Sequence, residues 1–92
     1  MTKFVIEREH KLSLDECLEL SKSLADSLIN SYGGTKRVGG NEVHYKHVSG
    51  STGLLSFDDS SLKVEVKLSF MMMSLKSALK KEIIIQCDKR LS

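Results

Sequence analysis

A chain of 92 residues has room for one domain, residues 1–92, with a modest core, and its net charge is only +2, from 14 basic and 12 acidic side chains. This balance excludes a disordered tail and a strongly basic nucleic-acid binder. The longest apolar run, residues 70–73, is far shorter than the roughly 20 residues of a membrane span, and the start of the chain has no secretory pattern. We therefore expect a cytoplasmic protein.

The first third of the chain predicts a strand followed by a helix. Residues 3–8 alternate in polarity over a short stretch, which favours an edge strand. Ser13 and Glu16 have the spacing of a capping box, in which each side chain accepts a hydrogen bond from the other residue's backbone N–H. The helix that they open has a single apolar face and ends at Gly33-Gly34, where glycine tolerates a left-handed C-cap.

Three segments separated by turns follow this helix. Residues 36–38 extend briefly, and residues 42–48 alternate so that Val43 and Tyr45 point inward. Residues 54–57 form the next strand, whose facing stays open because it begins with two adjacent leucines.

The last third predicts a strand that runs directly into a long helix. Aliphatic and charged side chains alternate over residues 62–68, and no Pro or Gly interrupts residues 70–91, for which Ser69 is the expected N-cap. At about 1.5 Å per residue this helix spans roughly 32 Å, whereas a common strand spans about 17–20 Å, so it should overhang the sheet. The predicted fold is α+β in the order β-α-β-β-β-α, an antiparallel sheet of three to four strands with two helices packed on one face.

The last helix carries more apolar side chains than one sheet can cover. Residues 71–73 and 83–85 are consecutive apolar triplets, and three successive helical residues cover most of the circumference. We expect the exposed part to contact a partner, and a homodimer would enlarge the small core. The side chains predicted to bind the partner are Phe70, Met71, Met73, Lys76, Lys80, Ile84 and Ile85.

Few residues suggest catalytic or metal chemistry. Cys17 and Cys87 fall inside predicted helices as reduced core thiols, without the Cys or His spacing of a zinc site. His44 and His47 lie three apart on a strand and point to opposite faces, and His10 is expected to hydrogen-bond near the start of the first helix. An enzyme would need a concave pocket around His10 or His44. We therefore predict no catalytic residue, no metal and no cofactor.

The basic side of the last helix allows an alternative interpretation. The order α-β-β-β-α after the first strand matches that of double-stranded-RNA-binding domains, which would make this an RNA-binding module. However, the basic cluster that those domains carry at the start of their last helix is replaced by residues 70–73, so a solvated face is the preferred interpretation. The basic side chains are Lys76, Lys80, Lys81, Lys89 and Arg90.

Short motifs spread over almost the whole chain carry a family resemblance. They are His10–Leu12, Tyr32-Gly33, Val43–Lys46, Gly50 with Gly53, Val64–Phe70, Leu75-Lys76 and Asp88–Leu91. In these motifs the chain resembles the polyhydroxyalkanoic acid system family, also called polyhydroxyalkanoate granule-region proteins. It departs from the family pattern at Ser69, where glycine is usual, and in a slightly longer loop at residues 49–53.

The resemblance implies a bacterial cytosolic protein linked with storage-polyester metabolism. Combined with the surplus apolar surface, it leads to the hypothesis of a non-enzymatic binding module. Its amphipathic C-terminal helix would associate with a storage-granule surface, a granule-associated protein or a second copy of the chain.

Overall fold

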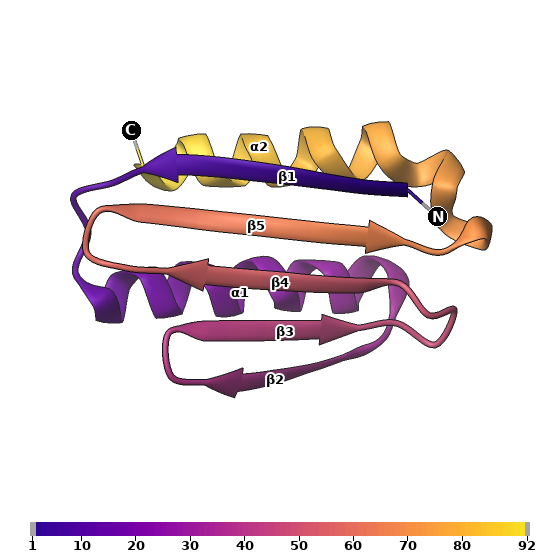
Figure 1. Ribbon diagram of the computed structural model, residues 1–92, viewed down its shortest axis with the longest axis horizontal. Coiled ribbons are helices and arrows are strands. Elements are labelled where there is room, and N and C mark those ends of the chain that lie inside the picture. The colour runs from indigo at the N-terminus through magenta and orange to yellow at the C-terminus, as the bar shows by residue number, and fades with distance from the viewer. Residues whose placement is uncertain (1, 92) are drawn as a thin grey trace.

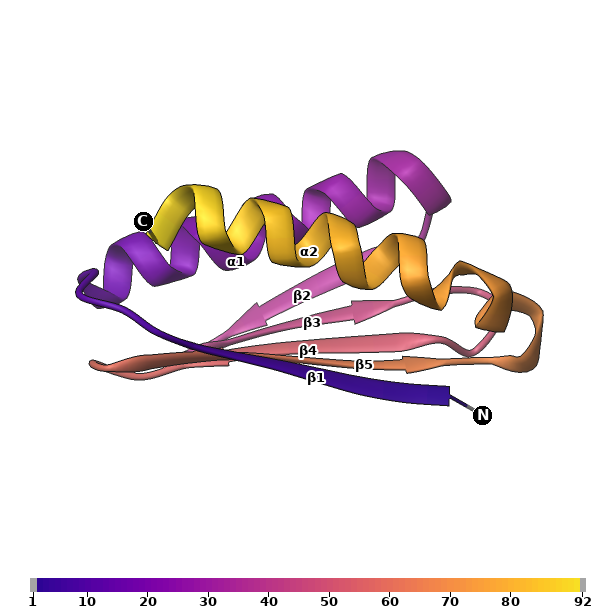
Figure 2. The same ribbon diagram turned by 90° about the horizontal axis from the view of Figure 1, so that it is seen from above.

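The computed structural model describes residues 2–91, and within them two helices cover one face of a five-stranded antiparallel sheet (Figure 1, Figure 2). The predicted α+β class and the placement of both helices on one face are confirmed, but the predicted count of three to four strands is wrong. The elements in chain order are β1 (Thr2–Glu9), α1 (Leu14–Tyr32), β2 (Thr35–Gly39), β3 (Glu42–Lys46), β4 (Thr52–Phe57), β5 (Ser61–Leu68), the 3-10 helix η1 (Phe70–Leu75) and α2 (Lys76–Leu91).

The strand order across the sheet is β1-β5-β4-β3-β2. β1 lies at one edge, as predicted, and β2 at the other. The segment that the sequence shows only as briefly extended is a full strand, because all five residues of β2 pair with β3. Between residues 2 and 91 four strands therefore separate α1 from α2, so the predicted match to the order of double-stranded-RNA-binding domains is wrong.

The predicted boundaries of α1 are confirmed. The backbone N–H of Glu16 donates to Ser13 Oγ at 3.2 Å, and the N–H of Ser13 donates to Glu16 Oε1 at 3.1 Å. The helix ends at Gly33, whose φ of +82° lies in the left-handed region. The next residue, Gly34, must also be glycine, because a Cβ there would lie 2.6 Å from the carbonyl oxygen of Lys46.

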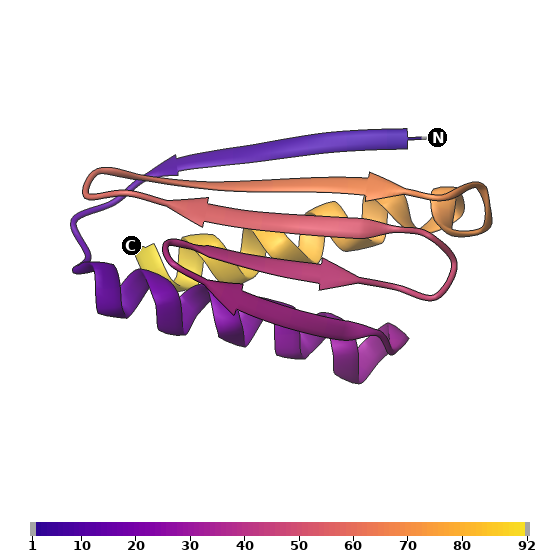
Figure 3. The same ribbon diagram turned by 60° about the horizontal axis from the view of Figure 1, so that its bottom comes forward.

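Alternation along the strands places one set of side chains against the helices. Val43 and Tyr45 are buried, as predicted, and β4 turns Leu55 and Phe57 inward and Leu54 outward, which settles the facing that the sequence left open. The opposite face of the sheet is not covered by either helix (Figure 3).

The end of β5 differs from the prediction in two respects. Residues 70–75 form a 3-10 helix before α2 begins, and Ser69 does not cap it with its side chain. Instead, the carbonyl of Ser69 accepts a hydrogen bond from Met72 N–H at 3.0 Å, while its hydroxyl is bound elsewhere. η1 projects beyond the end of β5, so the predicted overhang is present (Figure 1).

Contacts with β1 and α1 fix α2 over the sheet. Arg8 of β1 forms a 3.1 Å ion pair with Asp88, and Gln86 donates to Ser27 Oγ of α1 at 3.2 Å. Leu79, Ile83 and Cys87 of α2 are buried in the core. Both cysteines are free and buried, as predicted. Over residues 2–91, neither helix is long and apolar enough to cross a membrane.

Candidate interaction surface

One end of the molecule gathers exposed apolar side chains from two distant segments. Phe70 and Met71 of η1 expose 84% and 80% of their surface, and Val48 in the β3–β4 loop exposes 95%. Met73 is exposed to 40%. The β3–β4 loop and η1 both lie at the end of the sheet where β5 stops (Figure 1). We call these four residues the apolar tip.

A network of serine hydroxyls joins the two segments of the apolar tip. Ser51 Oγ accepts the backbone N–H of Ser69 at 2.9 Å and donates to Ser69 Oγ at 3.1 Å. Ser69 Oγ in turn donates to Ser49 Oγ at 3.0 Å. His47 extends the network to α1, because its Nε2 lies 2.9 Å from the carbonyl oxygen of Tyr32. Half-buried hydrogen bonds therefore hold the two segments of the tip together.

Of the residues predicted to bind a partner, three lie at the apolar tip and four lie along α2. Phe70, Met71 and Met73 lie together at the tip. Ile85 is half exposed, but it follows Met73 by 12 residues, which is roughly 18 Å along a helix. Ile84 packs partly against the core. The remaining predicted residues are Lys76, which is half buried, and Lys80, which is exposed.

Val48 is the tip residue that sequence reasoning missed. The strand predicted over residues 42–48 includes it as the last residue. β3 in fact ends two residues earlier, at Lys46. The available signal was an apolar residue directly before a Ser-Gly-Ser turn, a position where nothing local can cover it.

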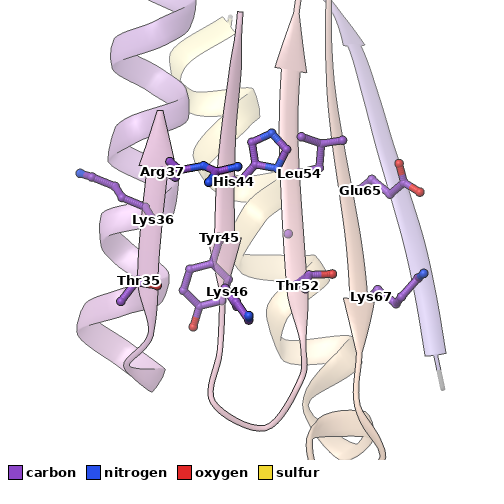
Figure 4. A pocket seen from close by; sticks show the side chains of 11 residues that line it. Thr35, Lys36, Arg37, His44, Tyr45, Lys46, Thr52, Leu54, Glu65 and Lys67 are labelled. Carbon is purple, nitrogen blue, oxygen red and sulfur yellow. The ribbon is translucent and has the colours of Figure 1, made fainter. Parts of the chain in front are cut away.

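The uncovered face of the sheet contains a shallow groove of about 710 Å³. Figure 4 shows its lining side chains in two rows across the strands. Its charge is mainly positive, because Arg37, Lys46 and Lys67 line it, whereas Lys36 is paired with Asp26 and the acidic lining residue, Glu65, is paired with Lys3 at 2.5 Å. The hydrogen bond from Lys3 lowers the pKa of the Glu65 carboxyl, so this pair stays ionised at neutral pH. The lining residues are Thr35, Lys36, Arg37, His44, Tyr45, Lys46, Thr52, Gly53, Leu54, Glu65 and Lys67.

The environment of His10 favours a structural role. Its Nδ1 accepts the N–H of Leu12 at 3.1 Å and its Nε2 lies 2.9 Å from the carbonyl oxygen of Asp58, which confirms the predicted hydrogen bonding near the helix start. The residue borders an open depression, but it is only 8% exposed. Cys17 Sγ lies 3.3 Å from Nε2, and burial raises the pKa of this thiol, which disfavours the reactive thiolate.

The other two histidines, His44 and His47, also contact nearby protein groups that account for their positions. His44 points to the outer face, as predicted, with Nε2 3.5 Å from the carboxylate of Glu42. His47 Nδ1 lies 2.8 Å from Ser49 Oγ, but it also accepts the backbone N–H of Ser49 at 3.0 Å, so the contact closes a local turn. Across residues 2–91, no group of three His, Cys, Asp or Glu side chains is placed to hold a metal ion.

The fold and these surfaces define a small two-layer α+β protein with an apolar tip at one end of the sheet and a cationic groove on the uncovered face. The chain belongs to the family described as "Putative polyhydroxyalkanoic acid system protein", which matches residues 4–91. The resemblance seen in the sequence motifs is thereby confirmed. A search of curated proteins finds no match to the chain.

Proposed function

We propose that this protein is a non-enzymatic accessory protein of polyester storage, located in the cytoplasm, that attaches to the surface of a storage granule through its apolar tip. The observation that carries the proposal is the exposure of Phe70 and Met71, directly after a residue, Ser69, that is hydrogen-bonded to the neighbouring loop. Monomeric soluble proteins seldom leave neighbouring large apolar side chains exposed without a partner. Family membership supplies the polyester context.

The energy of such a contact favours more than one copy at the surface. Burying a Phe or Met side chain contributes about 1.5–3 kcal/mol, so Phe70 and Met71 together contribute roughly 3–6 kcal/mol. Part of this free energy offsets the translational and rotational freedom that the protein loses on binding. The remainder corresponds to a dissociation constant near the millimolar range. A homodimer with two tips would bind far more tightly through its effective concentration. A granule-associated protein is the other partner that this surface would suit.

Cosedimentation with surfactant-free particles of polyhydroxybutyrate tests the proposal. We expect the wild type to sediment with the particles and the variant Phe70→Asp/Met71→Asp to lose at least tenfold in affinity, because each aspartate would have to be desolvated at the apolar contact. Ile85→Asp is the control, since it also places a charge at an exposed apolar position, but in α2 and away from the tip. Equal sedimentation of the wild type and the double variant would exclude the tip as the attachment surface.

A further inference from the structure

Charge is distributed unequally between the two ends of the sheet. The antiparallel register aligns one residue of each strand in a row beside the apolar tip: Thr35, Lys46, Thr52, Lys67 and Lys3. This row contains no carboxylate, and of its three lysines Lys3 is paired with Glu65 on the neighbouring strand, which leaves Lys46 and Lys67 to carry its positive charge. It lies next to the tip because Lys46 and Thr52 flank the loop that carries Val48, and Lys67 is two residues before Ser69.

The opposite end of the sheet carries the acidic side chains. The corresponding row there contains Glu7 and Glu42 with a single lysine, Lys63. The chain segments that reach the tip contain no Asp or Glu at all over residues 43–57 and 66–81. The protein is therefore an electrostatic dipole whose positive end is also its apolar end.

Lysines also approach the tip from the helical layer. Lys76 is the first residue of α2, directly after η1, and is half buried, so its aliphatic stem lies against the protein while its charge remains available. Lys46 and Lys67 project from the uncovered face of the sheet, two strands or roughly 10 Å apart (Figure 4). The apolar side chains thus have Lys76 on the helical side and Lys46 and Lys67 on the uncovered side of the sheet.

We propose that this end of the protein docks on an anionic lipid interface. Val48, Phe70 and Met71 enter the acyl layer, and Lys46 and Lys67 remain at the level of the phosphate groups. Apolar side chains with lysines at their rim are the combination that peripheral proteins use at such interfaces. The inference rests on the proposed function, since both use the same tip. It further specifies that the surface which the tip contacts is negatively charged. Bare polyester is uncharged and offers the lysine row no negative charge to pair with.

Vesicle cosedimentation tests the inference with lipid as the probe. We expect the full chain to bind vesicles of phosphatidylglycerol and phosphatidylcholine in equal parts at least tenfold more tightly than pure phosphatidylcholine vesicles. Lys46→Glu/Lys67→Glu should lose more than tenfold, since each lysine near an anionic surface contributes about fivefold, and 0.5 M salt should have a similar effect. Lys11→Glu/Lys89→Glu is the control, because it changes the net charge equally at the other end of the molecule.

The possible outcomes separate the two proposals. If phosphatidylglycerol gives no preference, or if the control pair loses as much affinity as Lys46→Glu/Lys67→Glu, the anionic interface is refuted while polyester attachment stands. If Phe70→Asp/Met71→Asp leaves binding to polyhydroxybutyrate particles unchanged, the proposed function itself is refuted. Thermal melts within a few degrees of the wild type ensure that each variant is folded.

Discussion

Two buried serines provide a direct test of the hydrogen-bond network that holds the apolar tip. Ser51 is 2% exposed, and its hydroxyl exchanges two hydrogen bonds with Ser69. Ser51→Ala would remove both bonds and leave the Ser69 N–H without its partner. At about 0.5–1.5 kcal/mol per hydrogen bond, the free energy of unfolding should fall by about 2 kcal/mol. For a domain of this size that lowers Tm by roughly 8–16 °C.

Ser21 is the matched control, because it is fully buried but its hydroxyl is the one buried side-chain oxygen or nitrogen between residues 2 and 91 without a hydrogen-bond partner. Ser21→Ala removes an unsatisfied polar group and replaces it with the residue of highest helix propensity. Stability should stay constant or rise by up to about 1 kcal/mol. Urea unfolding followed by circular dichroism measures both variants. A loss at Ser21→Ala equal to that at Ser51→Ala would refute the assignment of these bonds.

Three further predictions concern the core and the assembly. Burial raises the pKa of Cys87 from its ordinary value of 9.0 to about 11. Because the unfolded chain loses this proton more easily, the free energy of unfolding should fall between pH 9 and 11, by at most about 2.7 kcal/mol. Cys87→Ala should remove that part of the pH dependence. His10→Ala should cost about 2–3 kcal/mol in urea unfolding, because the Leu12 N–H and the Asp58 carbonyl lose their partner; a smaller loss than 0.5 kcal/mol would contradict this role. Light scattering should give the mass of a dimer, and a monomer mass at 100 μM would exclude self-association.

Local patterns predicted the parts of the fold that depend on neighbouring residues. The capping box of Ser13 and Glu16 and the facing of Val43 and Tyr45 follow from spacing alone, because capping and strand alternation involve residues only a few positions apart. The count of strands could not be read in this way. Residues 36–38 show little alternation, and they form a strand because β3 offers a complete ladder of partners.

Only part of the candidate site could be predicted, because some of its residues follow a local pattern and others depend on contacts between distant segments. Phe70, Met71 and Met73 were identified from the surplus of apolar residues on the last helix. The bonding of Ser69, which joins η1 to the loop that carries Val48, depends on a contact between segments about 20 residues apart, which no local pattern records. The side chain expected to cap the helix binds the neighbouring loop instead, so tertiary contacts override capping preference at this position.

The two ends of the described chain lie at opposite ends of the molecule (Figure 1). Thr2 pairs with Leu68 beside the apolar tip. In contrast, α2 ends at the other end of the molecule, over the C-terminal end of β1 (Figure 2). A fluorescent reporter fused after residue 92 would therefore leave the docking end free, and the same reporter placed before residue 2 would obstruct it. Comparing the two fusions by microscopy would reveal the orientation of the protein on whatever surface it occupies.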